Sequence, residues 1–147
     1  MTYETLTDAE TRDLRALAGL MIPASSTHGV PGADDDLIFA DILKSLERDT
    51  ADAKTALQQL VTLSGGAFSD LTAERRGEVA ARFKQEGGAP LFALNRVVLL
   101  CYYRDDRVMR SLGQEPRSPF PKGHVVEQGD WSLLDPVRKR PPMWRRV

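Results

Sequence analysis

The chain has 147 residues with 20 basic and 21 acidic side chains, which give a net charge of −1. This length is typical of one domain that buries a core without disulfides or metals, and the balanced charge argues against nucleic acid or anionic lipid as a partner. One cysteine cannot form an intrachain disulfide, and two histidines are too few for a Cys/His zinc cage. No apolar run approaches the roughly 20 residues that span a bilayer, and no export signal is seen, so we expect a cytoplasmic location.

Hydrophobic residues recur at helical spacing through most of the chain and are interrupted by turn-forming residues. Thr7 and Glu10 fit a capping box at the start of the first helix, and Pro23 ends that helix. Gly65 and Gly87 end two later helices. The predicted fold is all-α, a compact bundle of about five helices with a short sixth and an extended proline-rich C-terminal arm. The helices are expected at about residues 8–22, 35–48, 50–64, 73–86, 89–103 and 105–112.

The fifth predicted helix, residues 89–103, is the most apolar segment and carries apolar side chains nearly all round. Such a helix is normally central to its fold. We therefore expect Leu99 and Leu100 to be buried, so that replacing either with Ala would cost about 2–5 kcal/mol. Cys101 in the same helix is expected to be a buried, inert thiol.

The composition changes at Gly113, since residues 113–147 hold six of the nine prolines and show no sustained helical or strand period. They nevertheless include large apolar side chains, such as Trp131 and Trp144, that a disordered tail would lack. We predict a helical domain over 1–112 and an ordered, extended arm over 113–147. The arm is expected to pack on the domain, on a partner subunit, or on both.

No set of residues in the sequence has the pattern of a catalytic, cofactor-binding or metal site. His28 lies in a Gly/Pro-rich loop with no nucleophile nearby, and the acidic run 34–36 lacks the calcium-loop pattern and favours a helix start. The basic run 138–140 could contact nucleic acid, an acidic partner or only solvent, and the net charge disfavours the first. His124, after two prolines, has either an interface role or a hydrogen bond to its own backbone.

Several segments in order resemble the gluconate 2-dehydrogenase subunit 3 family, the small subunits of flavin-dependent sugar and alcohol dehydrogenases. Leu17–Ala24 resembles the family's first helix, which ends in Ile-Pro, and Gly29–Asp34 resembles its Gly-rich loop. Phe92–Asp105, with Tyr102-Tyr103 near its end, resembles the family's long apolar helix. Shorter stretches after this helix resemble the corresponding stretches of the family. These shorter stretches are Val108, Leu112-Gly113 and Pro121–His124.

The resemblance implies an all-helical, non-catalytic subunit that stabilises a large FAD-dependent oxidoreductase of the glucose–methanol–choline (GMC) type, acting on a sugar, glycoside or alcohol. The FAD and the catalytic base would belong to that partner, and this chain would hold no cofactor. Many family members carry a twin-arginine export signal that this sequence lacks, which favours a cytoplasmic hetero-oligomer. The alternatives are a free-standing interaction or chaperone-like module, and a small enzyme that uses His124 with Glu127 or Asp130.

Partner contacts are predicted mainly in the arm, because proline lowers the entropy lost on binding and because tryptophan and arginine are enriched in interface hot spots. The predicted partner-binding residues are Tyr102, Tyr103, Phe120, His124, Trp131, Trp144, Arg145 and Arg146.

Overall fold

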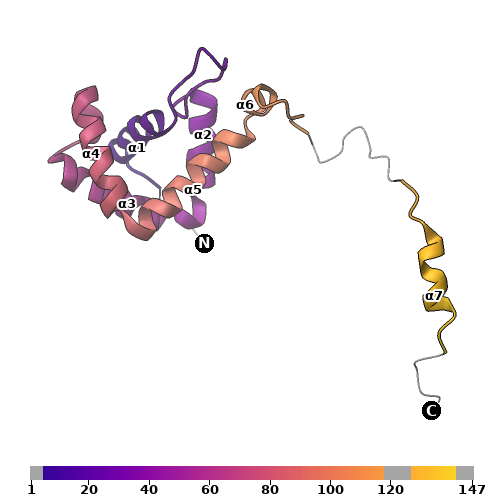
Figure 1. The fold of residues 1–147 in the computed structure, drawn as a ribbon. Helices are drawn as coiled ribbons and strands as arrows, with labels where there is room; N and C mark the ends of the chain where they lie inside the picture. The colour runs from indigo at the N-terminus through magenta and orange to yellow at the C-terminus, as the bar shows by residue number, and fades with distance from the viewer. Residues whose placement is uncertain (1–4, 118–126, 142–147) are drawn as a thin grey trace. The chain divides into compact units, whose positions relative to one another are not determined.

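The structure is a computed structural model that describes residues 5–117 and 127–141. The chain divides into two units, Met1–Pro116 and Arg117–Val147, and each is described here by itself. Within the described ranges all regular elements are helical, apart from an isolated bridge between Ser25 and Val30 (Figure 1). The all-α prediction is therefore confirmed.

The first unit contains the five predicted helices and the short sixth, with ends close to those expected, and two additional 3₁₀ turns. The α-helices are α1 (Asp8–Met21), α2 (Asp36–Ser45), α3 (Thr50–Ser64), α4 (Ala73–Glu86), α5 (Gly88–Arg104) and α6 (Asp106–Ser111), and the 3₁₀ turns are η1 (Glu47–Asp49) and η2 (Phe68–Asp70).

Local sequence signals set the ends of these helices. At the start of α1 the backbone N–H of Glu10 donates to Thr7 Oγ1 at 3.2 Å, and the Thr7 N–H donates to Glu10 Oε2 at 2.7 Å. This is the reciprocal capping box that the sequence predicts. At the end of α3, Gly65 has a φ of 72°, a left-handed conformation that costs glycine little.

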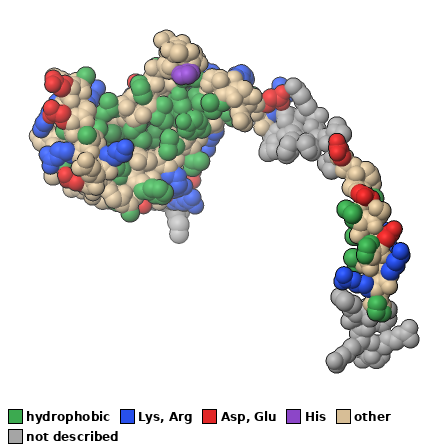
Figure 2. Space-filling view, viewed as in Figure 1, with side chains coloured by type: hydrophobic (Ala, Val, Ile, Leu, Met, Phe, Trp, Pro, Cys, Tyr) green, Lys and Arg blue, Asp and Glu red, His purple; other side chains and the backbone are tan. Residues whose placement is uncertain are grey.

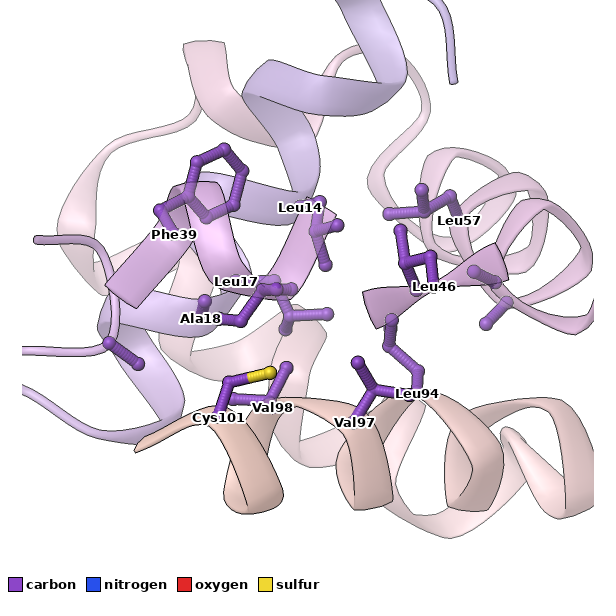
Figure 3. Packing of buried hydrophobic residues seen from close by; sticks show 14 of the residues in the cluster. Leu14, Leu17, Ala18, Phe39, Leu46, Leu57, Leu94, Val97, Val98 and Cys101 are labelled. Carbon is purple, nitrogen blue, oxygen red and sulfur yellow. The ribbon is translucent and has the colours of Figure 1, made fainter. Parts of the chain in front are cut away.

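The core lies where α5 packs against α2 and α3, with α1 alongside (Figure 3). Leu14 of α1, Leu57 of α3, and Leu94 and Val98 of α5 are each at most 1% exposed. Burying a side chain of this size stabilises the fold by about 1.5–3 kcal/mol. The inner side of α5 is therefore a major part of the core.

Phe68 completes the core from outside the six helices that the sequence predicts. It lies in η2 and is fully buried. The buried carboxylate of Asp13 in α1 accepts a hydrogen bond from the Ser69 N–H at 2.8 Å, and Arg76 of α4 donates to the Ser69 carbonyl. These contacts fix η2 against α1 and α4, and this keeps the Phe68 ring inside.

In the described part of the second unit, residues 131–138 are helical where the sequence predicts an extended arm without regular structure. Residues Trp131–Leu134 form the 3₁₀ turn η3, and Asp135–Arg138 form the short helix α7. Asp130 caps η3, because its Oδ1 accepts from the Ser132 N–H at 3.0 Å and from the Ser132 hydroxyl at 2.6 Å. Pro136 lies in the first turn of α7, where its missing N–H costs no hydrogen bond.

Candidate partner-binding surface

Helix α5 carries apolar side chains on two opposite sides, and the described residues of the helical unit cover only one of them. The covered side includes Leu94 and Val98. The other side, which we call the outer face of α5, consists of Phe92, Leu99, Leu100 and Tyr103, which are 73%, 43%, 56% and 54% exposed.

The exposure of Leu99 and Leu100 shows that their predicted burial is wrong. Helix α5 is apolar nearly all round, but α2, α3 and α4 pack against one side of it only. In the chain alone, an alanine at either position leaves no enclosed cavity, so the predicted cost of about 2–5 kcal/mol does not apply there.

The outer face of α5 forms a shallow groove. Asn95, Arg96 and Arg104 line it together with the four apolar side chains of the outer face. Figure 2 shows hydrophobic side chains gathered over this part of the helical unit. A contiguous apolar surface of this kind marks an interaction site more often than scattered exposed leucines do.

A second shallow groove continues this surface toward α1 and α4. Asn95 lines both grooves, so the two are adjacent. Leu20 and Met21 of α1 line the second groove beside Ala80 of α4 and Leu91 of α5. The apolar area available to a partner therefore extends over three helices.

Two arginines on the edge of the first groove are tied to acids outside it. Arg96 Nη2 lies 2.6 Å from Asp49 Oδ2, and Arg104 Nε lies 2.6 Å from Asp41 Oδ2. The hydrogen bonds that Arg104 donates to Asp41 raise the pKa of Arg104 above its ordinary value, against the opposing effect of burial. Both arginines on the edge of the groove are therefore already paired with acids of the chain itself.

Of the predicted partner-binding residues, Tyr103 lies on the outer face of α5 and Tyr102 does not. Tyr102 is 5% exposed, and its hydroxyl donates to the Pro31 carbonyl at 3.2 Å. Burial raises the pKa of this hydroxyl. Tyr102 therefore holds the Gly/Pro loop against the end of α5, and its side chain is not available at the surface for a partner.

The C-terminal unit presents a second group of exposed apolar side chains. Trp131, Leu133 and Leu134 of η3 and Val137 of α7 are all exposed, and the basic run 138–140 comes directly after them. Trp131 is exposed, and its role as a partner contact stays a prediction. The predicted residues Phe120, His124, Trp144, Arg145 and Arg146 lie outside the described residues.

A group of three charged side chains around Arg107 is structural. Arg107 Nη2 lies 2.6 Å from Asp35 Oδ1 and 3.0 Å from Asp105 Oδ2. Hydrogen bonds from Arg107 hold the pKa of both carboxyls below the usual value, and together these outweigh the effect of burial. Asp35 also caps α2 and Asp105 caps α6. Both acids are satisfied helix caps and do not form a catalytic pair.

The other candidates from the sequence have structural or surface positions. His28 lies exposed in the 25–30 loop. Cys101 is buried, and this burial raises the pKa of its thiol. Among the residues that the structure describes, no group of three or more His, Cys, Asp or Glu side chains could hold a metal ion. No described helix is long and apolar enough to cross a bilayer.

The fold and the surface define a class of protein, a small helical chain with an uncovered apolar helix face. Comparisons of the chain with family models, with curated proteins and with solved structures found no match. Sequence reasoning missed Phe92, Leu99 and Leu100 as surface residues. The signal that could have found them is the all-round apolarity of 89–103, which exceeds what one side of a surface helix needs.

Proposed function

We propose that this protein is a small, non-catalytic subunit that binds and stabilises a larger partner protein. The observation that carries the proposal is the outer face of α5, where four large apolar side chains of one helix lie side by side and are not covered by the described part of the helical unit. Covering such a face removes apolar area from water and is favourable in free energy. The exposed side chains at 131–137 form a second contact, in the arm.

The proposed partner is a large FAD-dependent oxidoreductase of the GMC type that acts on a sugar, glycoside or alcohol. Support for this partner comes from the resemblance of Leu17–Ala24, Gly29–Asp34 and Phe92–Asp105 to the gluconate 2-dehydrogenase subunit 3 family. In this proposal the partner holds the FAD and performs the oxidation. The present chain holds no cofactor and keeps the partner folded.

Co-expression with a flavoprotein of this type tests the proposal. The tagged chain should co-purify a large protein with flavin absorbance. A triple variant of the outer face, Phe92→Ser, Leu99→Ser and Tyr103→Ser, should retain at least tenfold less flavoprotein, because hot-spot residues each contribute about 2 kcal/mol or more.

The matched control is a double variant of exposed apolar residues elsewhere in the same unit, Leu37→Ser on α2 and Val61→Ser on α3. It should retain the flavoprotein at the level of the unchanged chain. Equal retention by both variants would remove the outer face of α5 from the interface. Absence of any flavoprotein from the unchanged chain would favour a free-standing interaction module.

Deleting residues 128–147 tests the second contact. If the arm holds the partner, the truncated chain stays helical by circular dichroism and loses co-purification. If the truncated chain instead loses thermal stability when purified alone, the arm serves the chain's own core. Retention of both properties would mean that Trp131 and its neighbours are not partner-binding residues.

A further inference from the structure

We draw no further inference here: the strongest candidate, the outer face of α5, carries nothing beyond the proposed function, because the arginines at the edge of its groove are already paired with Asp49 and Asp41 and nothing in the described part of the chain shows what covers it.

Discussion

The two sides of α5 have similar residues and opposite environments. On the inner side, Leu94 and Val98 touch the core and are fully buried; on the outer face, Leu99 and Leu100 are about half exposed. All four side chains belong to one helix and differ little in hydrophobicity. The apolar composition of α5 thus shows that both sides of the helix favour burial. It does not show whether a side is covered by the chain itself or by a partner.

The largest expected effect is on the inner side. Replacing Leu94 with Ala should lower the free energy of unfolding of the chain by about 2–5 kcal/mol, because the fully buried side chain leaves a cavity among α2, α3 and α5. Urea denaturation monitored by circular dichroism measures the change. A loss below about 1 kcal/mol would mean that the inner side is loosely packed and that the contrast between the two sides is false.

A smaller effect is expected where α5 is fastened at its C-terminal end. Arg107→Gln should lower the free energy of unfolding at neutral pH by about 1–3 kcal/mol, because Asp35 and Asp105 lose a charged hydrogen-bond donor. In the unchanged chain both carboxyls have a folded-state pKa below the ordinary 3.8. Their contribution is therefore present above pH 4 and is lost as the pH falls through the folded-state pKa.

The difference in stability between Arg107→Gln and the unchanged chain should accordingly shrink as the pH falls below 4. Denaturation curves between pH 7 and pH 2 measure it. Arg110→Gln is the control, since Arg110 pairs with Asp106 on the exposed surface of α6, and surface pairs of this kind contribute less than about 1 kcal/mol. A difference that stays constant with pH would show that the two carboxyls do not carry the effect.

The smallest effect on stability is expected on the outer face. Leu99→Ser should change the free energy of unfolding of the isolated chain by no more than about 0.5–1 kcal/mol, because the side chain is already half in water. Urea denaturation monitored by circular dichroism measures the change. A loss as large as that of Leu94→Ala would show that the outer face is covered within the chain itself.

The helices could be predicted from the sequence because their signals are local. The Thr7–Glu10 capping box and Gly65 act within a few residues, and the structure places helix ends at both. The burial of Phe68 could not be predicted in this way, because it depends on Asp13 and Arg76 from two other helices. The helix at 135–138 was missed because four residues are too few to show a period.

The candidate surface was only partly predictable for a related reason. Tyr103 and Trp131 are exposed where partner contacts were predicted, whereas Tyr102, next in sequence to Tyr103, points inward to the Pro31 carbonyl. Adjacent residues of a helix lie about 100° apart around its axis, so opposite roles are expected for such a pair. The side that faces inward depends on the packing of α2 and α3 against α5, which the period of an apolar helix does not reveal.

Arg107 and the two carboxylates that it binds, Asp35 and Asp105, should couple the local unfolding of two helix starts that are far apart in the sequence. One guanidinium holds the capping carboxylates of both α2 and α6, although these helices begin about 70 residues apart in sequence. When Arg107 leaves, both helix starts lose support together, and α6, with six residues, is too short to persist alone. Amide protons in the first turns of α2 and α6 should therefore exchange with solvent as one cooperative unit.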